Sequence, residues 1–187
     1  MKTLLIERYL DAGLIQFGWF EHRESVKPVA FKLEMLTSYP ELLLRSAQEL
    51  IRLAGETQFS HLLTPSESIG LGTAVALEMA VPLVYQRTTD ETQIDLVGAY
   101  DIGHPAVLVL DVFDRQHPPR ALIAHARRVG LEVNHVYCLV DIENGANPLE
   151  MYVSSVMTLR GIVERAAADG LIPPGQADVV REWINRG

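Results

Sequence analysis

The segment from residue 56 to residue 142 alternates between short apolar runs and longer stretches with apolar residues at helical spacing. Continuous apolar runs rich in β-branched residues are typical of strands buried on both faces, and helical spacing indicates amphipathic helices. The expected elements are a strand at 59–65, a helix at 68–80, a strand at 81–87, an exposed loop or hairpin at 88–104, a strand at 105–113, a helix at 119–130 and a strand at 133–142.

This order predicts an α/β protein with a central parallel sheet flanked by helices on both faces. Crossovers between parallel strands should be right-handed, and ligands of such sheets bind beyond the carboxyl ends of the strands. Three turns occupy those ends, with the sequences TPSESIG (64–70), QRTTDETQID (86–95) and DVFDRQHPPR (111–120). We therefore expect any ligand to lie near these turns.

The flanking segments carry further patterns. An amphipathic helix is expected over 3–15, ending near Gly13, and two short strands within the aromatic-rich segment 16–36. A helix over 40–56 should stop at Gly55, where glycine ends helices readily. The remaining predictions are a helix over 149–170 and a last short helix over 174–186.

Composition fits one soluble domain. The chain has 187 residues, of which 48% are hydrophobic and 21% charged, and no apolar run reaches the roughly 20 residues that a membrane helix needs. The apolar start carries Glu7, Arg8 and Asp11, which is unlike a signal peptide. The single cysteine, Cys138, lies in an apolar run, which favours a buried thiol in a reducing cytoplasm.

The net charge of −8 argues against nucleic acid and acidic membranes as partners, because the longest basic run is the pair Arg127–Arg128. A local pocket can still bind a small anion. The histidines are scattered without metal-ligand spacing, so no metal site is predicted.

Four stretches resemble orotate phosphoribosyltransferases, which are type I phosphoribosyltransferases. They are LIQFGWFEHRESVKPVAFKLEML, TPSESIGLGTAVALEMAVPLVYQR, VLVLDVFDRQHPPRALIAHARRVGLEVNHVYCLVDIENG and ADGLIPPGQADVVREWI, and together they span nearly the whole chain. The resemblance implies a single domain over 1–187, a small N-terminal hood to which 1–38 contribute, and a cytoplasmic homodimer.

The turn after the strand at 105–113 departs from the family pattern. The family's signature loop has two acidic residues, two apolar ones and then a run of Thr, Ser and Gly that cradles the 5′-phosphate of phosphoribosyl diphosphate (PRPP). Leu110 takes the first acidic position and Asp111 the second, while Asp114 begins a glycine-free run. Two interpretations remain: an ordinary turn with proline at the helix start, or a rebuilt anion site that uses Arg115 and His117.

The other two turns also differ from the family. In the first phosphate loop, Ser66 and Ser68 either cap the helix or contact ligand, and Glu67 would repel a diphosphate unless Mg²⁺ intervened. Arg87 matches a family arginine, but the loop over 88–95 has no Lys, Arg or His. Cations of that kind stabilise a departing diphosphate.

In the hood, Arg23 falls where the family has a substrate-contacting lysine, and Lys27 lies near its second basic position. Either side chain could bind a carboxylate, and surface solvation is the competing interpretation.

Three functional hypotheses follow. The leading one is a phosphoribosyltransferase-fold protein of pyrimidine nucleotide metabolism whose PRPP site has eroded. It would bind a small anionic ligand such as a nucleotide, orotate or a ribose phosphate, or would act in regulation. The second is an active, Mg²⁺-dependent orotate phosphoribosyltransferase that makes orotidine monophosphate, with Asp111 on the ribose, Arg87 on the diphosphate and Arg23 on the orotate carboxylate. The third is a structural or interaction protein without a ligand.

Overall fold

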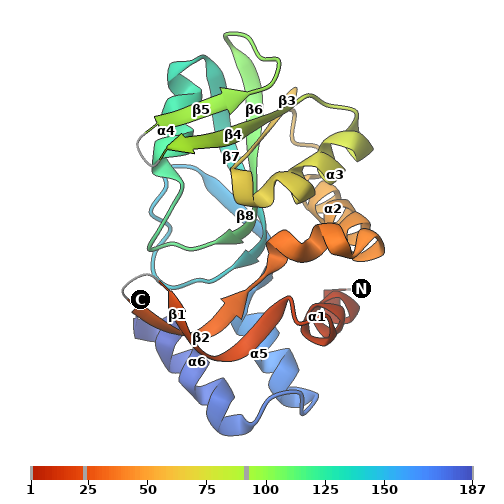
Figure 1. Ribbon diagram of the computed structural model, residues 1–187, viewed down its shortest axis with the longest axis vertical. Coiled ribbons are helices and arrows are strands. Elements are labelled where there is room, and N and C mark those ends of the chain that lie inside the picture. The colour runs from red at the N-terminus through yellow and green to blue at the C-terminus, as the bar shows by residue number, and fades with distance from the viewer. Residues whose placement is uncertain (1, 23–24, 91–92, 187) are drawn as a thin grey trace.

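The central feature of the computed structural model, which describes residues 2–22, 25–90 and 93–186, is a six-stranded sheet with the order β5-β4-β3-β6-β7-β8 (Figure 1). Strands β3, β4, β6, β7 and β8 pair in parallel, as expected, and β5 pairs antiparallel with β4. The hairpin that was one interpretation of 88–104 is therefore the β4–β5 pair. The strands are β3 (His61–Thr64), β4 (Leu83–Asp90), β5 (Gln93–Val97), β6 (His104–Phe113), β7 (Leu131–Asp141) and β8 (Tyr152–Thr158).

Both faces of the sheet are buried. Alternate side chains of a strand point to opposite faces, so Val107 and Val109 pack on one side of β6 while Leu108 and Leu110 pack on the other. The first side is covered by α2 (Pro40–Ala54), α3 (Ile69–Met79) and α5 (Leu159–Ala168), and the second by α4 (Arg120–Arg128). This burial explains why β6 has an uninterrupted apolar sequence.

The N-terminal segment forms a small hood. After α1 (Lys2–Asp11), β1 (Ile15–His22) and β2 (Ser25–Phe31) make a separate antiparallel pair, followed by the 3-10 helix η1 (Leu33–Ser38). The C-terminal helix α6 (Pro174–Arg186) packs against β2, and α1 and α6 both lie in the lower half of the molecule in the view of Figure 1.

The prediction of one helix over 149–170 is wrong in its first half. Residues 152–158 form β8, which extends the sheet beside β7, and only 159–168 are helical. Two features favour the break. Valine and tyrosine suit a strand, and the Thr158 side chain accepts a hydrogen bond from the Gly161 N–H at 3.1 Å, which caps the start of α5.

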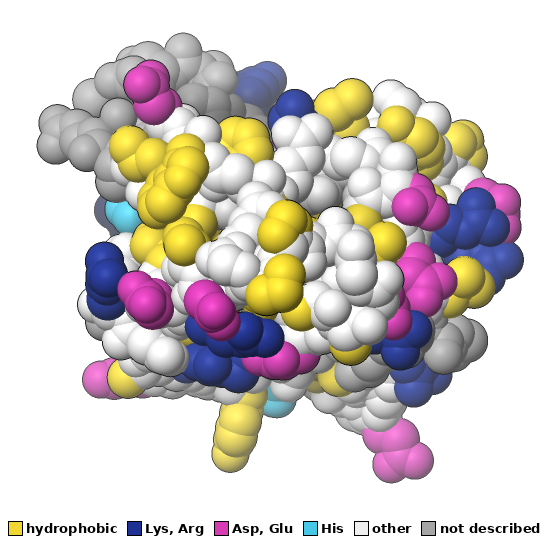
Figure 2. All heavy atoms as spheres, turned by 90° about the horizontal axis from the view of Figure 1, so that it is seen from below, with side chains coloured by type: hydrophobic (Ala, Val, Ile, Leu, Met, Phe, Trp, Pro, Cys, Tyr) yellow, Lys and Arg dark blue, Asp and Glu magenta, His cyan; other side chains and the backbone are white. Residues whose placement is uncertain are grey.

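Acidic and basic side chains alternate on the end of the molecule that carries α5 and α6, as Figure 2 shows for the side chains coloured there. Arg181 pairs with Glu164 and Asp178, and Arg165 pairs with Asp169. Within the described residues, no helix combines the length and apolar character needed to cross a membrane.

Candidate functional site

A cavity of about 460 Å³ lies between the hood and the carboxyl end of β6. Residues of β1, β2 and η1 form one wall, the end of β6 and the following turn form the floor, and Trp183 of α6 closes one side. The turn 64–70 contributes Pro65, Glu67 and Ser68. The cavity is thus at the edge of the sheet where the sequence predicts a ligand, and its volume suits a small organic molecule.

Asp111 lies near the carboxyl end of β6 and lines the cavity floor, with only 7% of its surface exposed. Its N–H donates to Ser68 Oγ at 2.9 Å, and its buried Oδ1 accepts no hydrogen bond from the described residues. Burial, and then the charges of Glu34 and Glu67, raise the pKa of this carboxyl to about 7. Asp111 therefore changes charge near neutral pH.

Asp114 is surrounded by donors. Its Oδ1 accepts from the Gln116 N–H at 3.0 Å and from Asn144 Nδ2 at 2.8 Å. Its Oδ2 accepts from Lys27 Nζ at 2.9 Å and lies 3.1 Å from His117 Nδ1. Burial opposes ionisation, but the hydrogen bonds from Asn144 and Lys27 outweigh it and lower the Asp114 pKa to about 2. This carboxylate is therefore permanently charged at neutral pH.

Three consecutive N–H groups of the turn are bonded within the chain. The Arg115 N–H donates to Asn144 Oδ1 at 3.1 Å, the Gln116 N–H to Asp114 Oδ1, and the His117 N–H to the Asp114 carbonyl at 3.1 Å. The next two residues are prolines, which have no N–H. The backbone donors of 115–117 thus hold the turn itself together.

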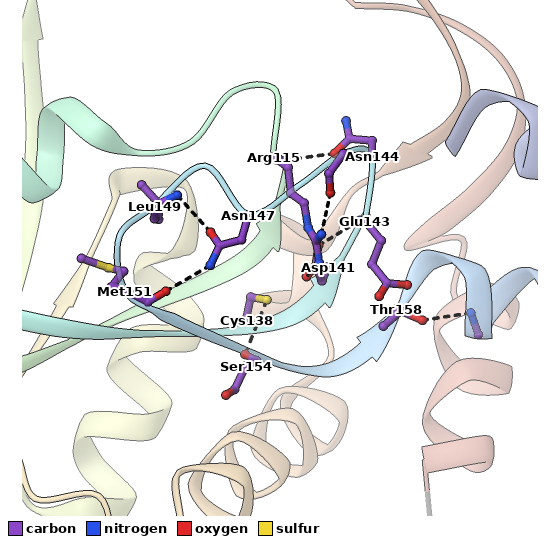
Figure 3. Close-up of polar contacts among 12 residues, drawn as sticks. Arg115, Cys138, Asp141, Glu143, Asn144, Asn147, Leu149, Met151, Ser154 and Thr158 are labelled. Atoms are coloured by element: carbon purple, nitrogen blue, oxygen red, sulfur yellow. Dashed lines mark hydrogen bonds and ion pairs between the residues drawn. The ribbon is translucent and has the colours of Figure 1, made fainter. Parts of the chain in front are cut away.

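The Arg115 side chain is not among those that line the cavity. Its Nε and one terminal nitrogen donate to the two oxygens of Asp141 at 3.1 and 2.8 Å, and its other terminal nitrogen donates to the Gly145 carbonyl at 2.6 Å. Figure 3 shows this fork beside Asn144, on the turn after β7. Such a two-point pair fixes the turn 114–119 to the turn 141–145.

Comparison with known proteins shows the fold. No protein-family model matches the chain. Among solved structures, it is similar to Leishmania donovani UMP synthase, with 24% identity and a TM-score of 0.86 over 100% of this chain and 42% of that chain. It is also similar to Aeropyrum pernix orotate phosphoribosyltransferase, with 22% identity and a TM-score of 0.78 over 88% of this chain and 98% of that chain.

This is an orotate phosphoribosyltransferase-like, type I phosphoribosyltransferase fold. The chain corresponds to less than half of the UMP synthase, and at these identities the likeness concerns architecture. A third similar structure is Mycobacterium tuberculosis H37Rv orotate phosphoribosyltransferase in complex with PRPP, with 15% identity and a TM-score of 0.64 over 86% of this chain and 90% of that chain.

In this phosphoribosyltransferase fold, some of the predicted site residues meet at the cavity. Lys27, Ser68, Asp111, Asp114 and His117 line it together. Lys27 is almost buried, and its ammonium lies 6.0 Å from the centre of the Trp183 ring as well as against Asp114. The predicted positions on β2, β6 and the two turns therefore converge in space.

Other predicted residues lie elsewhere. Arg87 pairs with Asp95 across the β4–β5 hairpin and is not among the lining residues. Ser66 is exposed and donates to the Glu67 carboxylate at 3.3 Å. Arg23 falls outside the described residues.

The two capping interpretations need correction. Ser68 occupies the N-cap position of α3, but its side chain makes no capping hydrogen bond and instead accepts the Asp111 N–H. Pro119, expected at the first helical position, lies at the N-cap of α4, which begins at Arg120. Ser68 thus links the first turn to the signature strand.

Three residues of the site are not indicated by any pattern in the sequence: Glu34, Asn144 and Trp183. Glu34 and Trp183 line the cavity, and Asn144 bonds to Asp114. Asn144 lies in a stretch whose composition indicates only a turn, ENGANP. Nothing in the local pattern of α6 distinguishes Trp183 from an ordinary core residue.

Among the described residues, no three His, Cys, Asp or Glu side chains gather closely enough to hold a metal ion. A Mg²⁺ ion would thus need ligand oxygens from a bound diphosphate or from water.

Proposed function

We propose that this chain, which has the orotate phosphoribosyltransferase-like fold, is a ligand-binding or regulatory protein whose PRPP site no longer binds PRPP. The observation that carries the proposal is the occupation of the phosphate cradle by Asp114. A phosphate is normally held by converging N–H groups and a cation. Here Gln116 N–H, Asn144 and Lys27 converge on a carboxylate of the chain itself.

The charge of Asp114 also opposes a phosphate. Two negative charges about 4 Å apart repel by about 4 kcal/mol at an effective dielectric constant of about 20. Lowering of the Asp114 pKa to about 2 means that protonation does not relieve this repulsion at neutral pH. A phosphate would have to displace Asp114 from Lys27, and both side chains are largely buried.

The residues expected to contact the leaving diphosphate give independent support to this proposal. Cationic donors aimed at the leaving diphosphate are each worth on the order of 10² to 10³ in rate. Segment 88–95 contains no Lys, Arg or His, and Arg87 is paired with Asp95. Glu67 lies at the cavity on the side of the first phosphate loop. We infer that transfer of a phosphoribosyl group is lost together with PRPP binding.

The nature of the natural ligand is a separate question. Two Mycobacterium tuberculosis orotate phosphoribosyltransferase structures hold inorganic phosphate and PRPP respectively, which concerns those proteins. A small anion such as a nucleotide, orotate or a ribose phosphate stays a prediction for this chain, and Lys27 and His117 are the predicted contacts that line the cavity. Cytoplasmic location and the homodimer also stay predictions.

An orotidine monophosphate assay tests the proposal. Orotate, PRPP and Mg²⁺ are incubated with the protein, and binding of PRPP with Mg²⁺ is measured by calorimetry in parallel. We expect neither product nor saturable PRPP binding. Turnover that disappears in Asp111→Asn but survives in Glu132→Gln, an exposed carboxylate at the far end of β7, would instead establish an active orotate phosphoribosyltransferase.

A further inference from the structure

Acidic side chains outnumber basic ones among the residues that line the cavity. Five carboxyl-bearing residues line it, and its only lysine or arginine among the described lining residues is Lys27. Lys27 is paired with Asp114, so it neutralises one of the five. The four others form no ion pair within the described residues: Glu21, Glu34, Glu67 and Asp111.

One oxygen of these carboxyl groups lacks a hydrogen-bond partner among the described residues although it is buried, while the Ser68 side chain is a hydrogen-bond partner of the same carboxyl group. Asp111 Oδ1 is inaccessible to water and accepts no hydrogen bond from the described residues. Buried polar atoms are almost always hydrogen-bonded, so this exception at the cavity is an acceptor whose hydrogen bond a ligand or a water molecule would complete. The missing group is a donor, because an ionised carboxylate can only accept.

The opposite wall is apolar. Val29 and Phe31 of β2, Leu33 of η1 and Trp183 of α6 line the cavity facing this acidic floor. Glu34 and Glu67 are exposed and lie at the mouth. The combination of an apolar wall, an acidic mouth and a buried acceptor suits a molecule with a flat or aliphatic body and a positively charged donor group.

We propose that the cavity binds a small organic cation, whose charged nitrogen donates to Asp111 and whose apolar body lies against the hood. An organic cation is favoured over a metal ion because the described residues offer no cluster of three metal ligands. This inference rests on the proposed function, since PRPP bound in an intact site would occupy the same cavity floor. It differs from the expected anionic ligand in the sign of its charge.

The experiment compares three probes of one shape and different charge: benzamidine, benzamide and benzoate. Each is titrated by calorimetry at about pH 8, above the Asp111 pKa of about 7, into the protein and its variants. We expect saturable binding of benzamidine, at least tenfold weaker binding of benzamide, and no binding of benzoate. A tenfold difference corresponds to about 1.4 kcal/mol.

Variants locate the binding. Asp111→Asn keeps the shape and removes the charge, and should weaken benzamidine at least tenfold. Glu67→Gln, at an exposed position where a neutral isostere should cost little stability, should weaken benzamidine binding severalfold, and Glu132→Gln outside the cavity should leave it unchanged. Benzoate binding as tightly as benzamidine, absence of benzamidine binding, or unchanged benzamidine affinity in both Asp111→Asn and Glu67→Gln would overturn the inference.

A titration with PRPP and Mg²⁺ separates the two proposals. If PRPP does not bind and benzamidine does not bind, only the cation inference fails. If PRPP binds, the proposed function fails, whatever the result with benzamidine.

Discussion

Replacement of Asp114 by serine would remove the carboxylate on which the donors of the turn 114–119 converge. The smaller side chain leaves Lys27, Asn144 and the Gln116 N–H directed at an empty position of about the size of a phosphate oxygen group. If Asp114 stands in for a phosphate, the variant should lose stability on its own and regain it when inorganic phosphate is added.

The size of the loss follows from the pKa of Asp114. A decrease from 3.8 in the unfolded chain to about 2 in the folded protein corresponds to about 2 kcal/mol of stability at neutral pH. The carboxylate is only 16% exposed, so solvent screening reduces this value little. For a chain of 187 residues, about 2 kcal/mol lowers Tm by about 4–8 °C.

Phosphate should reverse part of that loss. A ligand that binds only the folded state, present at about ten times its Kd, adds about 1.4 kcal/mol, which is about 3–6 °C in Tm. The assay is a thermal melt of the protein and of Asp114→Ser, with and without about 10 mM phosphate at constant ionic strength. Only the variant is expected to gain.

A matched control is Asp178→Ser, which removes an exposed aspartate paired with Arg181 on α6. It should lose little stability and gain nothing specific from phosphate. Equal stabilisation of the unchanged protein and of Asp114→Ser by phosphate would refute the reasoning, because it would mean that an anion binds without competing with Asp114.

Three further predictions concern buried charges. The folded-state pKa of Asp111, about 7, is above its unfolded value of 3.8, so the contribution of Asp111 to stability should fall as pH rises from about 4 to about 7, and the difference in unfolding free energy between the protein and Asp111→Asn should change over this range. Arg115→Ala leaves the buried Asp141 carboxylate without its partner and should cost about 3–5 kcal/mol in urea unfolding, whereas a loss below 1 kcal/mol would mean that the fork is dispensable. Burial, and then His104, lower the His61 pKa from 6.5, so the contribution of His61 to stability should fall as pH drops below about 6.5, and a His61→Gln variant whose stability changes with pH in the same way as that of the unchanged protein would contradict that assignment.

The fold was predictable from sequence where a single physical cause dominates. Strands β6 and β7 are buried on both faces, which gives an apolar run that no exposed strand would have. Strand β8 was not predictable in this way because its burial is incomplete, it contains two serines, and it continues into α5 without a glycine or proline. The break depends on Thr158 and on pairing with β7, which a local pattern does not reveal.

The site was predictable only as a set of positions. The likeness to a known signature strand located Asp111 and Asp114, and the loss of glycine from the following turn indicated a changed phosphate site. The pairing of Asp114 with Lys27 spans 87 residues and that with Asn144 spans 30, so it depends on tertiary contacts. The role of Arg115 also depends on tertiary contacts. The sequence predicts a ligand contact for this side chain, whereas in the structure it pairs with Asp141.

A crystal structure of the protein soaked with PRPP and Mg²⁺ tests the central claim most directly. The account predicts that Asp114 keeps its contacts with Lys27 and Asn144 and that no phosphate lies against the N–H groups of residues 115–117. A 5′-phosphate bonded to those N–H groups, with Asp114 turned away from Lys27, would contradict it.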